Sequence, residues 1–235
     1  MNKCSNPVLL TSDYDGTISP INLKANINAI QKFINDGNIF VISTARSKTS
    51  IMRKIKKHNI PVNYITCFNG SEIIEPNGNI VAAFEMNRQV LTFMASLLKS
   101  NQNVSDITFV NRNGNVFSRG IIPNSAIVIR CTCPIYYDLR KEIKGIPGYT
   151  CKRFGTTFEI KPSHVDKSFA AGELVRYLKE KEATSVSEYS IGNTLNDYEL
   201  LKNHNGYVIN SGSPSLKKKI KNHTSSVSAL ISKIN

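Results

Sequence analysis

The chain has 235 residues, and its hydrophobic fraction of 40% excludes a disordered protein because enough apolar surface is available to build a core. A formal net charge of +13 predicts a surface that attracts anions, such as phosphorylated metabolites, nucleic acid or acidic membranes. The first seven residues contain one lysine and no long apolar stretch. We therefore expect no signal peptide, no membrane span and no membrane partner, and a cytoplasmic protein.

The cysteines and the basic stretches add little to this picture. Five scattered cysteines, an odd number, argue against a disulfide framework and predict reduced thiols. The densest basic stretches, 46–58 and 217–221, follow helix-like patterns without interleaved aromatic residues. A solvated helix face is expected there, ahead of a nucleic-acid site.

Alternating apolar strands and amphipathic helices fill the first part of the chain. Strands are expected over 7–11, 39–42 and 62–68, and helices over 21–36 and about 47–58. Gly37 is expected to end the first helix. This alternation predicts an α/β fold with a doubly wound, Rossmann-like and mostly parallel sheet.

The pattern changes after residue 70 and returns near residue 166. A hairpin is expected over 71–83 around Asn77-Gly78, then a helix near 87–98 and several strands up to 160. The later part predicts a helix to about 181, strands at 189–191 and 207–209, a short helix from 195, and C-terminal helices. The expected domains are a core, 1–83 and 155–235, and an inserted α+β cap domain, 84–154.

Two acidic residues directly follow the first apolar strand. Asp13 and Asp15 lie where open α/β sheets bind ligands, at the carboxyl end of a strand. Carboxylates this close repel each other unless a cation or shared proton relieves them, so the pair predicts a divalent metal. An ordinary Asp-Gly turn remains an alternative. An EF-hand loop is excluded, because its sixth position would be Ile18 instead of Gly and its twelfth Lys24 instead of Glu.

The run Asp13-Tyr14-Asp15-Gly16-Thr17 after an N-terminal strand resembles the haloacid dehalogenase superfamily of phosphohydrolases. Three later stretches resemble that family's other motifs in the same order. They are Val41 to Arg46 with Thr44 as the hydroxyl, Phe158 to Lys167 with Lys167 as the cation, and Ile191 to Asp197. Each match alone has a simpler explanation, as a strand end, a surface lysine or a helix cap. Together they identify the chain as a member of the superfamily.

The inserted segment lies between the second and third motifs, which is similar to the Cof-type sugar phosphatases, sucrose phosphatase and trehalose-phosphate phosphatase. This resemblance implies a Mg²⁺-dependent phosphomonoester hydrolase that acts through an aspartyl-phosphate on a sugar phosphate or similar small phosphorylated metabolite. It implies catalytic roles for Asp13, Asp15, Thr44 and Lys167, with Asp13 as the nucleophile and Asp15 as acid and then base.

The resemblance also implies the binding residues. The substrate ligands would be Thr44 and Lys167. Arg46 and Asn69 lie just past strand ends and are further candidates to reach the substrate, although a cation at an ordinary helix start is an equal alternative for Arg46. The metal ligands would be Asp13, Asp15, Asn193 and Asp197, with Asn196 in support. Asn193 stands where the family has an aspartate, and its amide lacks the charge that makes a carboxylate a strong magnesium ligand.

The inserted segment is expected to close over the site and to select the leaving group. Its candidate residues for that selection are the basic ones, Arg112, Arg119, Arg130, Lys152 and Arg153. Two alternatives to a metabolite phosphatase stay open. The net charge favours an enzyme acting on phosphorylated nucleic-acid ends, and Asn193 favours a weakly active or regulatory phosphate-binding protein.

Overall fold

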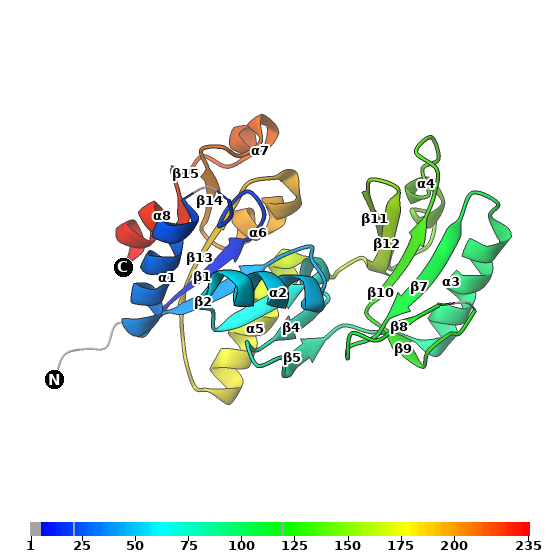
Figure 1. Ribbon diagram of the computed structural model, residues 1–235, viewed down its shortest axis with the longest axis horizontal. Coiled ribbons are helices and arrows are strands. Elements are labelled where there is room, and N and C mark those ends of the chain that lie inside the picture. The colour runs from blue at the N-terminus through cyan, green and yellow to red at the C-terminus, as the bar shows by residue number, and fades with distance from the viewer. Residues whose placement is uncertain (1–5, 21, 119) are drawn as a thin grey trace. The chain divides into compact units, whose positions relative to one another are not determined.

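The structure is a computed structural model that describes residues 6–20, 22–118 and 120–235 (Figure 1). The chain forms two compact units. The first, called the core unit here, contains Met1–Val81 and Lys167–Asn235. The second, called the insert unit, contains Ala82–Asp166.

The core unit contains an eight-stranded sheet in the order β15-β14-β13-β1-β2-β3-β4-β5. In that order the strands are His223–Thr224, Gly206–Ile209, Ser187–Gly192, Val8–Asp13, Ile39–Ser43, Tyr64–Cys67, Glu72–Ile74 and Ile80–Ala83. Neighbours from β15 to β3 run parallel, and β4 is antiparallel to β3. The expected doubly wound, mostly parallel α/β fold is therefore confirmed.

Local sequence explains these strands. β1 and β2 are nearly continuous runs of aliphatic and β-branched residues, as strands buried on both faces require, and Leu10, Phe40 and Ile42 are fully buried. β4 and β5 form the expected hairpin around Asn77-Gly78. Gly78 has a φ of 92°, the left-handed conformation that such turns favour in glycine.

Serine side chains start several helices of the core unit. Its helices are α1 Leu23–Asn35, α2 Lys48–His58, α5 Lys167–Lys181, α6 Tyr198–Asn203, α7 Pro214–Lys219 and α8 Val227–Ile234, with 3₁₀ turns η1 Phe68–Gly70 and η2 Leu195–Asp197. Ser47, Ser213 and Ser226 each accept a hydrogen bond from a backbone N–H in the first turn of α2, α7 and α8. Gly37, with a φ of 87°, follows the C-cap of α1 as expected.

The insert unit is an α+β layer. Its five-stranded sheet has the order β11-β12-β10-β7-β8, with a separate β6–β9 pair. The elements are β6 Met86–Asn87, α3 Arg88–Ser100, β7 Ser105–Val110, β8 Val116–Phe117, β9 Ser125–Ala126, β10 Val128–Thr132, α4 Arg140–Ile143, β11 Tyr149–Phe154 and β12 Thr157–Pro162. Buried residues of α3, α4 and the sheet form its core. Cys131 and Cys133 belong to this cluster as buried free thiols.

The boundaries of the insert unit differ from the predicted ones. β12 pairs antiparallel with β11 from Tyr149↔Pro162 to Phe154↔Thr157, and it pairs with β10 on its other side. A boundary at 154/155 would separate these paired strands, so the predicted limits 83/84 and 154/155 are corrected to 81/82 and 166/167. The core resumes at Lys167.

Across the part of the chain that the structure describes, none of the helices combines the length and apolar character needed to cross a bilayer.

Candidate active site

Asp13 and Asp15 lie at the carboxyl end of β1, next to the equivalent ends of β2 and β13. Asp13 is the last residue of β1 and pairs with Ser43, the last residue of β2. On the other side, Ser12 pairs with Ile191 of β13. The Asp13 side chain is 9% exposed, whereas that of Asp15 is 55% exposed. The two carboxylates therefore occupy different environments.

The loop after β1 is a tight turn built around one carbonyl group. The Tyr14 carbonyl oxygen accepts hydrogen bonds from the backbone N–H groups of residues 17–19. Gly16 has a φ of 79°, and a Cβ added to it would lie 2.1 Å from Asn193 Nδ2. The turn therefore requires glycine both for its backbone conformation and for the close approach of Asn193.

Lys167, the first residue of α5, bridges two buried carboxylates. Its Nζ donates to Asp13 Oδ1 at 2.6 Å and to Asp197 Oδ1 at 2.7 Å. The Lys167 side chain is 3% exposed and that of Asp197 is 1% exposed. One cation between two carboxylates leaves the cluster with a net charge of about −1, which a bound cation would neutralise.

The environment raises the pKa of both the acid and the base of this cluster, which disfavours the charged form of Asp13 and favours that of Lys167. Burial raises the pKa of the Asp13 carboxyl to about 6 even though Lys167 favours its ionisation, and the charge of Asp197 adds to the rise. Burial works against the charge of Lys167, but the two carboxylates outweigh it and raise the pKa of the Lys167 ammonium. Lys167 is therefore protonated in the range where Asp13 titrates, and a local cation would favour the Asp13 carboxylate.

The Asp197 carboxylate is engaged on both oxygens. Oδ1 accepts from Lys167, and Oδ2 accepts from the backbone N–H groups of Asn193 and Thr194 at 3.0 Å each and from Thr194 Oγ1 at 3.3 Å. A carboxylate has about four lone-pair sites, which these donors match. Asp197 thus orients Lys167 and the loop after β13, and a direct bond from Asp197 to a metal would displace one of these donors.

The Asn193 amide contacts the backbone of the loop that follows Asp13. Asn193 Nδ2 donates to the Asp15 carbonyl oxygen at 3.0 Å, so the amide and that carbonyl are neighbours. A half-turn of the amide about its last side-chain bond presents Oδ1 in place of Nδ2. Asp13, the Asp15 carbonyl and Asn193 would then provide a carboxylate, a carbonyl and an amide oxygen as candidate ligands for a cation.

This donor set fits a partly hydrated magnesium ion. The described residues contain no group of three or more His, Cys, Asp or Glu side chains placed to hold a metal. Magnesium keeps several water ligands and is commonly held by one or two carboxylates, whereas a dedicated protein cage is unusual for it. The Asp13 carboxylate with two neutral oxygens, close to the second charge of Asp197, meets that description.

Asp15 is paired with Arg46. Arg46 Nε donates to Asp15 Oδ2 at 2.7 Å, and Arg46 Nη2 donates to Asp15 Oδ1 at 2.6 Å. This hydrogen bonding raises the pKa of the Arg46 guanidinium. Arg46 also lies over the Tyr14 ring, 5.8 Å from its centroid. Asp15 must leave this two-bonded pair before it can exchange a proton with another group.

The remaining predicted residues lie at neighbouring strand ends. Thr44 directly follows β2, is buried, and accepts a hydrogen bond at Oγ1 from the Arg46 N–H at 3.1 Å. Asn69 follows β3 and accepts at Oδ1 from Asn196 Nδ2 at 2.6 Å. The contacts described above join Asp13, Asp15, Thr44, Arg46, Lys167, Asn193 and Asp197 into one cluster. Asn69 adjoins this cluster, because its backbone N–H donates to the Thr44 carbonyl oxygen at 2.9 Å, and Asn196 is linked to it through Asn69.

Residues 10–124 match the family of haloacid dehalogenase-like hydrolases, and this stretch includes the Asp13 loop, Thr44 and Arg46. Over this stretch the chain is similar to that family. None of the curated protein sequences matches it significantly.

Solved structures of haloacid dehalogenase-like proteins share the fold. A phosphatase of the haloalkanoate (HAD) superfamily from Bacteroides thetaiotaomicron is 18% identical with a TM-score of 0.73, over 97% of this chain and 94% of the other. A haloacid dehalogenase-like hydrolase from B. subtilis is 16% identical with a TM-score of 0.73, over 97% and 99%. A third, also from Bacteroides thetaiotaomicron, is 15% identical with a TM-score of 0.74, over 97% and 100%. At these identities the similarity concerns the fold.

Two hydroxyl groups of the site are not among the predicted residues. Thr17 is buried, and its Oγ1 donates to Asp13 Oδ2 at 3.3 Å. Thr194 and Asp197 form a capping box at the start of η2. The Thr-x-x-Asp spacing is a recognisable signature of a helix start, so Thr194 can be found from sequence. Thr17 reaches Asp13 through the tight turn, which the sequence does not specify in such detail.

Two of the basic residues predicted to select the leaving group form hydrogen bonds within the insert unit. Arg130 Nε donates to Glu159 Oε1 at 2.8 Å. Arg153 donates to backbone carbonyl groups of residues 135 and 155 at 2.6 and 2.8 Å. Arg119 lies outside the described residues. Arg130 and Arg153 thus stabilise the insert unit itself.

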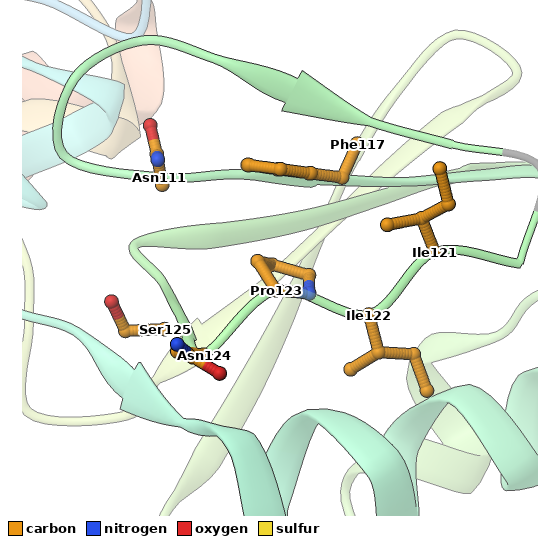
Figure 2. Close-up of a pocket in the computed structure, with 7 residues that line it drawn as sticks. All are labelled: Asn111, Phe117, Ile121, Ile122, Pro123, Asn124 and Ser125. Carbon is orange, nitrogen blue, oxygen red and sulfur yellow. The ribbon is translucent and has the colours of Figure 1, made fainter.

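The insert unit contains a cavity of about 350 Å³ (Figure 2). Its lining consists of Asn111, Phe117, Ile121, Ile122, Pro123, Asn124 and Ser125. Figure 2 shows the side chains of Phe117, Ile121 and Ile122 at one end, and Asn111, Asn124 and Ser125 toward the other. The residues that line this cavity carry no charge, so it suits a neutral group.

Proposed function

We propose that this protein is a Mg²⁺-dependent phosphomonoester hydrolase that forms an aspartyl-phosphate on Asp13. The proposed substrate is a small phosphorylated metabolite such as a sugar phosphate. The observation that carries this proposal is the bridge from Lys167 Nζ to Asp13 at 2.6 Å and to Asp197 at 2.7 Å, at the carboxyl end of β1. It combines a nucleophile, a fixed cation and neighbouring oxygen ligands.

In the proposed reaction an Asp13 carboxylate oxygen attacks phosphorus in line, and the bond from phosphorus to the leaving oxygen breaks. Asp15 gives its proton to that leaving oxygen. Water then attacks the phosphorus of the aspartyl-phosphate, Asp15 takes a proton from this water, and the bond to Asp13 breaks to release phosphate. Such proton transfer typically contributes about 10²–10⁴-fold to the rate.

Lys167 and Thr44 provide the donors for the phosphate oxygens. The Lys167 ammonium is fixed between two carboxylates, so it needs no rearrangement when charge develops on the phosphoryl group. Mg²⁺ held by Asp13, the Asp15 carbonyl and Asn193 would supply further positive charge beside that group. The insert unit is the proposed cap, which excludes water and selects the neutral part of the substrate.

The test is hydrolysis of p-nitrophenyl phosphate in millimolar Mg²⁺. We expect the wild type to be active and Asp13→Asn to be inactive, while Asp36→Asn, an exposed aspartate after α1, serves as the matched control. Asp15→Asn should accumulate the intermediate, seen by mass spectrometry as one phosphoryl group on the peptide that contains Asp13. Hydrolysis that survives in Asp13→Asn would exclude this mechanism. A panel of phosphorylated sugars and other metabolites then defines the substrate class.

A regulatory phosphate-binding protein is the second candidate. It is favoured by the Asn193 amide, which donates a hydrogen bond to the Asp15 carbonyl where a charged metal ligand would otherwise stand. This candidate predicts that the wild type binds vanadate in calorimetry but hydrolyses no aryl phosphate. Turnover by the wild type would exclude it.

A further inference from the structure

A polar cluster joins the start of α5 to β13 and to the end of α6. His204, the residue after α6, has its Nδ1 2.5 Å from Oε2 of Glu188 in β13. Its Nε2 lies 3.1 Å from Ser168 Oγ and 3.2 Å from the Ser168 carbonyl oxygen. Asn203 Nδ2 donates to the same Ser168 Oγ at 3.0 Å. Ser168 directly follows Lys167 in the first turn of α5.

The hydrogen-bonding capacity of each group fits this cluster. The Glu188 carboxylate only accepts, so Nδ1 of His204 donates to it, while Nε2 lies within hydrogen-bond distance of both the hydroxyl and the carbonyl of Ser168 and its role depends on the tautomer. Ser168 Oγ can still accept from Asn203. The His204 side chain is 11% exposed, so water competes little for these bonds. The cluster is anchored further because Ser190 Oγ of β13 donates to the His204 carbonyl oxygen at 2.9 Å.

The same elements carry the bridge of the active site. α5 begins with Lys167, and α6 begins one residue after Asp197, so the cluster fixes the two segments whose side chains meet at 2.7 Å. We propose that His204 is a positioning residue that holds the first turn of α5, and with it the Lys167 ammonium, between Asp13 and Asp197. The effect of His204 on catalysis rests on the proposed function. Its effect on the position of Lys167 does not.

A Ser-His-carboxylate arrangement is also known from nucleophilic serines. Here the geometry points to a structural tie. Asn203 donates to the Ser168 oxygen that would have to attack, and the imidazole Nε2 also lies against the carbonyl of the same serine. Both contacts tie the end of α6 to the first turn of α5, which is a structural role.

Two substitutions separate the two bonds of His204. His204→Gln places an amide where Nε2 lies and keeps the contact with Ser168, whereas His204→Asn places one where Nδ1 lies and keeps the contact with Glu188. His223→Ala is the matched control. His223 belongs to β15, and its Nε2 also lies within hydrogen-bond distance of a backbone carbonyl oxygen, that of Ile220. Far-UV circular dichroism and thermal unfolding show that each variant is folded.

The first readout is labelling of Lys167 by acetic anhydride, measured by mass spectrometry, which does not depend on turnover. Losing a buried hydrogen bond typically costs about 1–3 kcal/mol, so local opening and labelling should rise roughly five- to a hundredfold in His204→Ala and His204→Asn. His204→Gln and His223→Ala should match the wild type. Unchanged labelling of Lys167 in His204→Ala and His204→Asn would overturn the inference.

The second readout is hydrolysis of p-nitrophenyl phosphate with Mg²⁺. A misplacement of about 1 Å can cost about 10²-fold, so kcat should fall by about that factor in His204→Asn, with a smaller change in KM and recovery in His204→Gln. Labelling that rises while kcat stays at the wild-type value would overturn the catalytic part. A wild type without activity would contradict the proposed function, and the labelling result would still decide where Lys167 is held.

Discussion

Replacing Asp13 with asparagine should stabilise the metal-free protein at neutral pH while it abolishes turnover. The buried cluster has two carboxylates and one ammonium, and the substitution leaves Lys167 with a single charged partner, Asp197. Burial raises the pKa of Asp13 from 3.8 to about 6. At about 1.36 kcal/mol for each pH unit, the ionised Asp13 costs about 3 kcal/mol of the free energy of unfolding.

The sign of the pH dependence follows from this raised pKa. Between pH 3.8 and about 6 the folded state holds the Asp13 proton more tightly than the unfolded chain does. The stabilisation from that proton is complete below the lower value and is lost as pH rises through about 6. The difference in unfolding free energy between Asp13→Asn and wild type should therefore grow from pH 4 to 7 and stay constant above it.

Urea unfolding with a chelator, followed by far-UV circular dichroism because the chain has no tryptophan, measures this difference. Added Mg²⁺ should raise the stability of the wild type by mass action and that of Asp13→Asn by much less. Asp36→Asn controls for the loss of any carboxylate. An Asp13→Asn protein that is less stable than wild type at pH 8, with a pH-independent difference, would refute the unbalanced charge inferred for the cluster.

The remaining predictions concern the same site. Asn193→Asp adds a charged ligand, so the Mg²⁺ concentration for half-maximal aryl phosphate hydrolysis should fall; an unchanged requirement would contradict a ligand role. Lys167→Met leaves two buried carboxylates uncompensated and should lower the free energy of unfolding by about 3–5 kcal/mol. In the control Lys24→Met, which replaces an exposed lysine, the free energy of unfolding should change little. Gly16→Ala should displace Asn193 and lower kcat, whereas Gly37→Ala, with a similar φ but open space, should be less stable yet fully active.

The sequence predicts the core elements well because their signals are local. The apolar runs of β1 and β2 and the serine cap of α2 each lie within one short segment. The end of the insert unit carries no such signal. Thr157–Pro162 leads directly to the Lys167 helix, but its strand pairs with β10 and β11. Pairing across a sheet depends on residues distant in sequence, so the predicted boundary fell twelve residues early, at 154 instead of 166.

The candidate site likewise has residues that the local sequence predicts and contacts that it does not. Asp13, Thr44 and Lys167 can be predicted because each lies at the end of a strand or the start of a helix. The contacts between side chains could not be predicted from the sequence. Arg46 pairs with Asp15 across 31 positions, and His204 contacts Ser168 across 36. Such contacts depend on the fold that brings the segments together, and the side chains themselves have ordinary local surroundings.

The spacing of two residues between Asp13 and Asp15 explains how one short motif could serve the two chemical roles that we propose for it. In a regular strand these side chains would point to the same face, but β1 ends at Asp13 and the turn directs Asp15 to a different environment. Asp13 remains buried beside Lys167, where a bound cation would favour its ionised form, the one required of the nucleophile that we propose. Asp15 is exposed and reversibly held by Arg46, so it can exchange protons with a leaving group or water once that pair opens. A nucleophile needs burial and a proton carrier needs access, and the end of a strand provides both within three residues.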